Sequence, residues 1–244
     1  YTASYVLEPT AGLSTARNTG ARAATTSWVF YLDDDGIAHP DMLEQFQRAI
    51  GTSSIGVIGG RYEHYFAEAP AKWVRHYYRS PVRASQRSGS VMLEPGQYLS
   101  GGIMAAHKTI LLKHPFDPTY GMYGPQPGFG EENEWQDRLR RAGISIWYND
   151  KIGMKHLVQS TKQTIRNRLN LAYAHGRYYF LKNASNKVVP GRARYWLALL
   201  STLLSAVPYD LGRTLFKPGF YWQNGLVSTA GKLAFVRGKY GREP

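Results

Sequence analysis

The sequence of 244 residues contains no cysteine. Structural disulfides, zinc sites built on thiolates and thiol nucleophiles are therefore excluded, and any metal ion must be held by oxygen or imidazole ligands. Of the residues present, 43% are hydrophobic and 14% are aromatic. This composition is typical of a globular chain, and the length predicts one large domain or one domain with an extension.

The sequence also lacks an apolar run long enough to cross a bilayer. The longest run, 195–207 (YWLALLSTLLSAV), falls short of the roughly 17 to 25 residues that a spanning helix needs. Arg192 and Arg194 precede it, Pro208 follows it, and the residues after that mix aromatic with basic side chains. This mixture favours a helix that attaches to a membrane interface, and a helix packed on the protein's own core fits equally well.

The given sequence does not open on a recognisable leader. The first residues, YTASYVLEP, include neither an initiator methionine nor a basic and apolar stretch. No secretory signal is visible, and we expect that N-terminal residues precede this sequence.

Acidic residues are scarce in the second part of the sequence. Residues 1–150 hold 14 Lys and Arg against 15 Asp and Glu, whereas residues 151–244 hold 16 against 2, so nearly all of the net charge of +13 lies there. Such a segment attracts polyanions, and nucleic acid, an anionic membrane or a phosphate-bearing substrate would each fit. An ordinary solvated surface fits as well.

Three adjacent aspartates follow the most β-prone segment. Residues 27–32 (SWVFYL) predict a central strand covered on both faces, and Asp33, Asp34 and Asp35 follow it directly. In open α/β sheets, ligands bind at the carboxyl ends of strands. Adjacent carboxylates repel one another, and a divalent cation such as Mg²⁺ or Mn²⁺ relieves this repulsion. The triplet therefore predicts a metal site, with a solvated acidic turn as the alternative.

Two glycines and a helix with acids at its start come later. Gly101 and Gly102 stand in an apolar context, where the backbone can approach a ligand closely or form a bulge. Residues 131–143 predict a helix that begins with Glu131 and Glu132. Acids in a first turn also suit the helix dipole, so these two side chains do not by themselves indicate a site.

A histidine follows the next predicted strand. Residues 144–148 predict a short strand, and His156 comes soon after it. A lone histidine is usually structural, but a neutral imidazole could share a metal ion with the aspartates.

The order of these motifs resembles that of the inverting glycosyltransferases of family 2. The motifs are GLSTARN, WVFYLDDDG, SGGIMAAHKTIL and GFGEENEWQDRLRRAG, followed by the strand that leads to His156. The resemblance covers roughly residues 5 to 180. It implies an α/β fold of the GT-A type, with a Rossmann-like mixed sheet flanked by helices, incomplete at its N-terminus and extended by C-terminal helices.

The resemblance implies roles for individual residues. Asp35 would bind the donor diphosphate through Mn²⁺ or Mg²⁺, with His156 as a second metal ligand, and Glu132 would be the catalytic base. The positions that match donor-binding residues of the family are Arg17, Asp33, Asp34, Asp35, Gly101 and Gly102.

Two departures from the family pattern affect these expectations. The family's base is commonly Asp, and because Glu132 is one methylene longer, Glu131 and Glu134 are alternates. The family also opens with a strand and helix that bind the nucleobase, and this sequence starts after them. We expect that the sequence is a piece of a longer protein or that another chain completes the cleft.

The implied function is inverting transfer (EC 2.4) of a sugar from a nucleotide-diphosphate donor to an acceptor hydroxyl, in polysaccharide or glycolipid assembly. We expect a catalytic domain over 1–180 and a basic, aromatic helical extension over 181–244, with His175 and Arg177 at a diphosphate or acceptor rim. The expected partners are a nucleotide-diphospho-sugar, a saccharide or lipid-linked saccharide, and a peripheral membrane contact, without nucleic acid. The expected location is the cytoplasm, peripheral on the inner face of a bacterial plasma membrane.

Other classes compete with this interpretation. A non-enzymatic nucleic-acid-binding protein would use the basic second part but leaves the acidic triplet unexplained. A metal-dependent nucleotidyl or phosphoryl transferase would use the triplet but gives Glu132 and His156 no role, and the sequence has no Gly-rich Lys motif for phosphate. A degenerate transferase that only binds a glycan is the third alternative.

Overall fold

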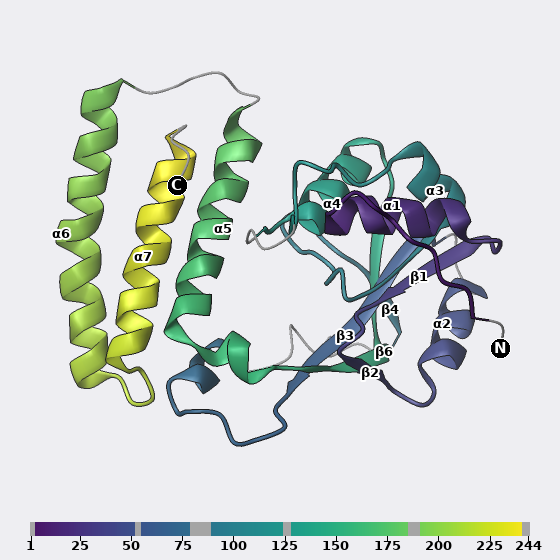
Figure 1. Cartoon of the computed structure of the whole chain (residues 1–244), viewed down its shortest axis with the longest axis horizontal. Coiled ribbons are helices and arrows are strands. Elements are labelled where there is room, and N and C mark those ends of the chain that lie inside the picture. The colour runs from purple at the N-terminus through teal and green to yellow at the C-terminus, as the bar shows by residue number, and fades with distance from the viewer. Residues whose placement is uncertain (1–2, 52–54, 79–88, 124–127, 185–190, 241–244) are drawn as a thin grey trace. The chain divides into compact units, whose positions relative to one another are not determined.

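The computed structural model describes residues 3–51, 55–78, 89–123, 128–184 and 191–240. The chain divides into two compact units, which we call the sheet unit and the helical unit (Figure 1). The sheet unit consists of Tyr1–Tyr65, Ser80–Gly124 and Glu131–Leu157. The helical unit consists of Phe66–Arg79, Pro125–Gly130 and Val158–Pro244. The expected boundary between residues 180 and 181 is a different division, and it stays a prediction.

A mixed sheet of six strands forms the centre of the sheet unit. Its strands are β1 (Trp28–Leu32), β2 (Gly36–Ala38), β3 (Val57–Tyr65), β4 (Ser90–Met92), β5 (Ile103–His107) and β6 (Ile146–Leu157). Their order is β1-β5-β3-β6-β2, and β4 pairs with β6 off this path. β3 and β6 run parallel, whereas the other pairs are antiparallel. The expected α/β class with a mixed sheet is confirmed.

Helices cover both faces of this sheet. They are α1 (Leu13–Ala23), α2 (Met42–Gly51), α3 (Lys108–Lys113) and α4 (Glu131–Arg141). α2 lies on one face, and α1, α3 and α4 lie on the other (Figure 1). Alternation along the strands explains this division, because Val57 packs in the core beneath α4 while its neighbour Ile58 packs in the core beneath α2.

α4 is anchored by a buried tryptophan. The ring of Trp135 is fully buried and stacks on Phe116 with 4.8 Å between ring centroids, and its Nε1 donates to the carbonyl oxygen of His114. Removing such a ring costs about 3–5 kcal/mol, so this contact fixes the helix firmly. The acids at its first turn are positioned by the same anchor.

Two strands differ from the sequence-based expectation. β1 is the outermost strand of the sheet order rather than a central one, and its residues are only partly buried. β6 is longer than the predicted strand at 144–148 and continues through His156. Neither difference could be predicted from a continuous apolar run, because the run reports β propensity and not the position of the strand in the sheet.

A register shift in the pairing of β3 with β6 determines where the end of β6 lies. The pairing with β3 shifts after Gly60, where a Cβ atom would lie 1.8 Å from the carbonyl oxygen of Ile152. Only glycine permits this approach of the two backbones. Beyond the shift, His156 pairs with Gly36 of β2.

Three long helices make up most of the helical unit: α5 (Ile165–Ala184), α6 (Arg192–Phe216) and α7 (Trp222–Lys239). Short 3₁₀ turns, η1 (Val74–Tyr77) and η2 (Ser160–Gln163), belong to the same unit. α7 packs against both α5 and α6. Its Gly238 permits close approach to α5, since a Cβ atom there would lie 2.0 Å from the carbonyl oxygen of Gly176.

α6 passes through a proline. Pro208 lies inside the helix, which continues to Phe216, although proline has no N–H to donate to the preceding turn. Across the described ranges, none of the helices combines the length and the apolar character needed to span a membrane.

Candidate functional site

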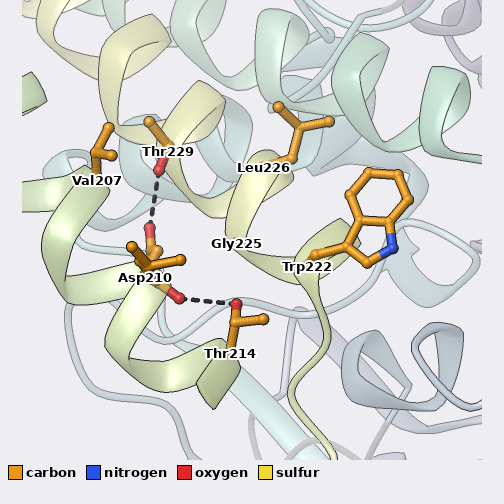
Figure 2. A pocket seen from close by; sticks show the side chains of 8 residues that line it. Val207, Asp210, Thr214, Trp222, Gly225, Leu226 and Thr229 are labelled. Atoms are coloured by element: carbon orange, nitrogen blue, oxygen red, sulfur yellow. Dashed lines mark hydrogen bonds between the residues drawn. The ribbon is translucent and has the colours of Figure 1, made fainter.

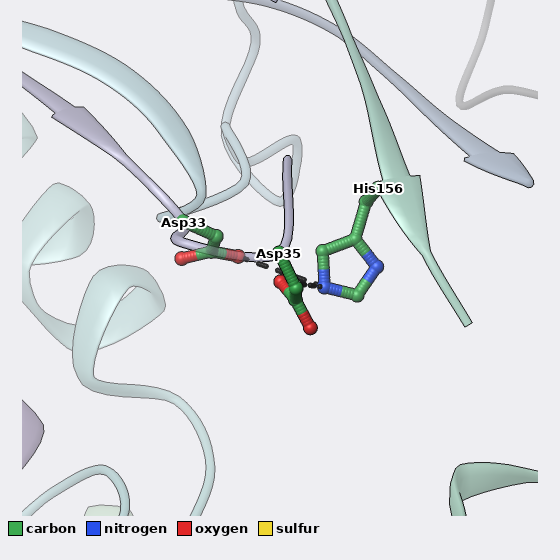
Figure 3. A group of neighbouring side chains, drawn as sticks. All are labelled: Asp33, Asp35 and His156. Atoms are coloured by element: carbon green, nitrogen blue, oxygen red, sulfur yellow. Dashed lines mark ion pairs between the residues drawn. The ribbon is translucent and has the colours of Figure 1, made fainter. Parts of the chain in front are cut away.

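Two aspartates and a histidine meet at the end of β1. The Nε2 atom of His156 lies 2.9 Å from Oδ1 of Asp35 and 3.9 Å from Oδ2 of Asp33 (Figure 3). One ligand atom from each of the three side chains falls within 4.8 Å of the others. Asp34, between the aspartates, is exposed and is not part of this cluster.

Backbone contacts hold this cluster in place. The N–H of Gly36 donates to the carbonyl oxygen of Asp33 at 3.0 Å, which closes a tight turn, and the N–H of Leu157 donates to that of Asp35 at 2.9 Å. Tyr62 stacks on the ring of His156 with 4.9 Å between centroids. Strands β1, β2, β3 and β6 therefore all contribute to the geometry.

The donor set fits a divalent cation. Carboxylate oxygens suit Mn²⁺ and Mg²⁺, and an imidazole nitrogen is a ligand that Mn²⁺ readily accepts. Two carboxylates so close together repel each other unless positive charge lies between or beside them. The side chains of Asp33 and Asp35 are 35% and 16% exposed, so the cluster is open enough for solvent or a ligand to complete a coordination shell.

Gly101 and Gly102 lie directly against two of the predicted site residues. A Cβ atom on Gly102 would lie 2.2 Å from Oδ2 of Asp33, and a Cβ atom on Gly101 would lie 2.4 Å from Nη2 of Arg17. A side chain at either position would therefore have to displace one of these groups. The sequence predicted a close approach here, and the approaching groups are the chain's own side chains.

Arg17 forms a buried ion pair with Glu131. Its Nη1 lies 2.8 Å from Oε1 of Glu131, and both side chains are 8% exposed. The guanidinium carbon also lies 5.4 Å from the centroid of the Phe116 ring. The role of Arg17 on the nucleotide side stays a prediction, and the contact that the structure gives it is with α4.

The three acids at the start of α4 have different surroundings. Glu131 is held by Arg17, and Glu134 is held by Arg138 through two contacts of 3.0 and 3.1 Å. Glu132 is partly buried beside Glu131, and this burial together with the negative charge of Glu131 raises the pKa of Glu132 to about 8. Once ionised, a carboxylate with such a pKa is a stronger base than an ordinary one.

Gln136 is a residue that sequence reasoning missed. Its buried side chain accepts from the N–H of Leu99 at 2.8 Å and donates to the carbonyl oxygen of Leu99 at 3.1 Å. This pair of hydrogen bonds fixes the segment that leads into Gly101. A polar residue on the apolar face of the helix, one position after Trp135, was the signal available in the sequence.

His175 and Arg177 lie on α5 of the helical unit. The ring of His175 packs against Phe129 with 3.9 Å between centroids. This contact stays within the helical unit, so a rim formed by His175 and Arg177 remains a prediction.

Within the sheet unit, the structure connects the other residues of the predicted site, except Asp34 and Glu134, through two series of contacts. One series of contacts runs from Glu132 through Glu131 and Arg17 to Gly101, and a second runs from Gly102 through Asp33 to the other members of the metal cluster. Because Gly101 and Gly102 are consecutive, the two series meet.

Residues 3–114 match the model of Glycosyl transferase family 2, which confirms the resemblance over that segment. The match includes Asp33, Asp35 and both glycines. Glu131, Glu132 and His156 lie beyond it.

Solved structures also match parts of the chain. The crystal structure of a mycobacterial protein is 19% identical with a TM-score of 0.39, covering 69% of this chain and 51% of that one. The crystal structure of GalNAc-T7 with UDP, GalNAc and Mn²⁺ is 14% identical with a TM-score of 0.47, covering 81% of this chain and 38% of that one. The present chain thus spans about half of the first and less than half of the second. No curated protein matches the sequence.

Proposed function

We propose that this chain is the donor- and acceptor-binding part of an inverting glycosyltransferase. The observation that carries the proposal is the cluster of Asp33, Asp35 and His156, because its two aspartates lie near Gly102 in the segment that matches the model of Glycosyl transferase family 2. The substrate would be a nucleotide-diphospho-sugar, and the reaction would form a glycosidic bond to an acceptor hydroxyl.

Asp33, Asp35 and His156 would hold the metal, Mn²⁺ or Mg²⁺. Bound there, the cation supplies positive charge to the diphosphate of the donor and so makes the nucleoside diphosphate a better leaving group. Tyr62 keeps the imidazole oriented by stacking on it and donates its hydroxyl to Asp33 at 3.4 Å. Gly101 and Gly102 leave room for the side chains of Arg17 and Asp33.

Glu132 would be the base. Its carboxylate takes the proton of the acceptor hydroxyl as that oxygen attacks the anomeric carbon, while the bond from this carbon to the diphosphate oxygen breaks. One displacement of this kind inverts the configuration of the anomeric carbon. Arg17 holds Glu131 by an ion pair and leaves the neighbouring Glu132 available.

The acceptor would be a saccharide or a lipid-linked saccharide, as expected for polysaccharide or glycolipid assembly. His175 and Arg177 are proposed to receive the anionic part of the acceptor or of the donor. The enzyme would act in the cytoplasm at the inner face of a bacterial plasma membrane.

A pair of variants tests the base. Glu132→Gln should bind donor nucleotide with unchanged affinity in the presence of Mn²⁺ and transfer sugar at least about a hundredfold more slowly, the effect typical of losing a general base. Glu134→Gln is the matched control, because Glu134 is already engaged by Arg138, and it should keep most of the activity. Normal transfer by Glu132→Gln would overturn the assignment.

Product analysis separates the alternatives. A glycosyltransferase releases the nucleoside diphosphate and attaches only the sugar, whereas a nucleotidyl or phosphoryl transferase attaches a phosphorus-containing group. Label in the sugar and in the β-phosphate of the donor distinguishes these outcomes. Tight binding of nucleic acid without any transfer would favour the polyanion-binding alternative.

A further inference from the structure

α6 presents an unusually apolar surface. Trp196 and Leu204 on this helix are 65% and 68% exposed. The exposed large apolar residues between Arg194 and Lys217 are Trp196, Leu197, Leu200, Leu203, Leu204, Val207, Tyr209, Leu211, Leu215 and Phe216. Single exposed leucines are ordinary, but a continuous set of this size marks an interaction surface.

These residues form a stripe along the helix. Successive members recur every three or four positions, which is the spacing of one helical face. The recurring positions are Trp196, Leu200, Leu204, Val207, Leu211 and Leu215. We call this set the α6 stripe.

The side chains of α6 itself need few hydrogen bonds from water. Residues 195–209 contain no charged side chain. The hydroxyl of Thr202 donates to the carbonyl oxygen of Ala198 at 2.7 Å, and that of Ser205 donates to the carbonyl oxygen of Ser201 at 2.8 Å. Hydroxyl groups bonded within their own helix tolerate an apolar medium.

The stripe continues into a groove between α6 and α7 (Figure 2). The groove has a volume of about 250 Å³, and its apolar walls come from Val207 and Leu211 of the stripe and from Trp222 and Leu226 of α7. Trp222 is 60% exposed. A tryptophan at the rim of an apolar surface is typical of a membrane interface.

The charges around the stripe are positive. Arg192 and Arg194 are exposed at the start of α6, and Lys217 is exposed just after its end. Asp210 is the single acid between residues 158 and 240, and it is buried against Lys232 and Arg213. No exposed carboxylate in the described part of this segment would oppose an anionic surface.

We propose that the α6 stripe and its groove bind an anionic phospholipid surface, with α6 lying along the membrane plane. The apolar side chains enter the acyl region, and the basic residues at both ends of the helix contact phosphate groups. This inference does not depend on the proposed transferase activity, because vesicle binding requires neither metal nor nucleotide.

Charge favours a lipid surface over other occupants. A second copy of the chain packed stripe to stripe would bring basic side chains of both copies together, which costs free energy at low salt. Nucleic acid would satisfy the positive charge but would leave the leucines uncovered. An anionic bilayer satisfies both requirements at once.

Vesicle flotation of the full chain tests the proposal. The probes are vesicles of phosphatidylcholine alone and vesicles of equal parts phosphatidylcholine and phosphatidylglycerol, each at low and high salt. We expect flotation with the anionic vesicles at low salt and a marked reduction with neutral vesicles or high salt. The absence of flotation with anionic vesicles at low salt would overturn the proposal.

Two leucine variants with the same exposed fraction provide the control. Leu200 in the stripe and Leu43 on α2 are both 53% exposed. Leu200→Asp should weaken vesicle binding by about tenfold or more, because a leucine leaves the acyl region and a charge takes its place. Leu43→Asp should bind vesicles like the unmodified chain. Equal loss in both variants, or in neither, would contradict the assignment to α6.

Further readouts guard against misfolding and self-association. Circular dichroism and nucleotide binding of Leu200→Asp should match those of the unmodified chain. Sedimentation in the absence of lipid tests whether a second copy of the chain covers the stripe instead. A dimer that Leu200→Asp converts to a monomer, together with unchanged vesicle binding, would assign the stripe to a second copy and overturn the proposal.

Discussion

Arg17 of α1 and Glu131 of α4 form an ion pair in the interior of the sheet unit, with 2.8 Å between Nη1 and Oε1. Each of the two side chains is 8% exposed. The same guanidinium lies where a side chain on Gly101 would have to go. The pair therefore joins the helix that carries Glu132 to the loop beside the metal cluster.

Arg17→Met should destabilise the protein strongly. It removes the partner of a buried carboxylate, and losing one partner of such a pair typically costs about 3–5 kcal/mol. The free energy of unfolding in urea measures this change. Adding Glu131→Gln should recover a large part of the loss, because no uncompensated charge then remains, and a double variant as unstable as Arg17→Met would contradict the account.

Gly101→Ala and Gly102→Ala should have separable effects. The new Cβ atom at residue 102 meets the carboxylate of Asp33 at 2.2 Å, so Mn²⁺ affinity should fall, whereas that at residue 101 meets Arg17 at 2.4 Å and should leave Mn²⁺ binding nearly intact. Sugar transfer should decrease in both. Gly20→Ala is the control, because no atom lies within 4 Å of the Cβ atom that it adds. Calorimetry measures the binding of Mn²⁺ to all three variants.

Glu132→Gln should change how stability depends on pH. The pKa of Glu132 is raised from 4.5 to about 8 in the folded state, so the stability that this group contributes is complete below pH 4.5 and is lost as the pH rises through about 8. Glutamine does not titrate. As the pH rises from 5 to 9, the free energy of unfolding of the variant should therefore increase relative to that of the unmodified protein, by on the order of 2–4 kcal/mol. Denaturation at pH 5 and at pH 9 measures this change.

The same group should shape the activity profile. If Glu132 accepts the proton, kcat/KM should rise with pH and level off above about 8, because the free enzyme must have this carboxyl ionised. A profile that is flat from pH 6 to 9 would contradict its role as base.

Asp210 should stabilise the helical unit. Burial by itself raises the pKa of Asp210, but hydrogen bonds from Lys232, Ser228 and Thr229 outweigh this and hold the pKa below its usual range. Its stabilising contribution is present above pH 3.8 and is lost as the pH falls through the lowered value. Asp210→Asn should lower the free energy of unfolding by about 1–3 kcal/mol at pH 7.

Asp41→Asn is the control for Asp210→Asn. Asp41 is exposed, and its side chain accepts from Gln45 on the surface of the sheet unit. Its replacement should change stability by no more than about 0.5 kcal/mol. Equal changes in the free energy of unfolding of the two variants would contradict a stabilising contact of Asp210 between α6 and α7.

The local parts of the site could be predicted from sequence. A β-prone run ending in aspartates, and a helix whose first turn carries Glu131 and Glu132, are short-range patterns that depend on neighbouring residues. The glycines at 101 and 102 could also be predicted as points of close approach. The family match over 3–114 includes the aspartates and the glycines, whereas the helix of Glu131 and Glu132 lies beyond it.

The long-range parts could not be predicted. That His156 reaches Asp35 depends on a register shift after Gly60, and a register is set by pairing between distant strands. The ion pair between Arg17 and Glu131 likewise joins residues 114 positions apart. No periodicity in the sequence reports such a contact.

Calorimetric titration tests the central claim most directly: Mn²⁺ first, then UDP, GDP and dTDP in its presence, into the unmodified chain, Asp35→Asn and the control Asp41→Asn. The account predicts that Mn²⁺ and one of the nucleotides bind to the unmodified chain and to Asp41→Asn. Asp35→Asn should lose both. Nucleotide binding that persists without Mn²⁺, or in Asp35→Asn, would contradict the assignment of this cluster as the metal and donor site.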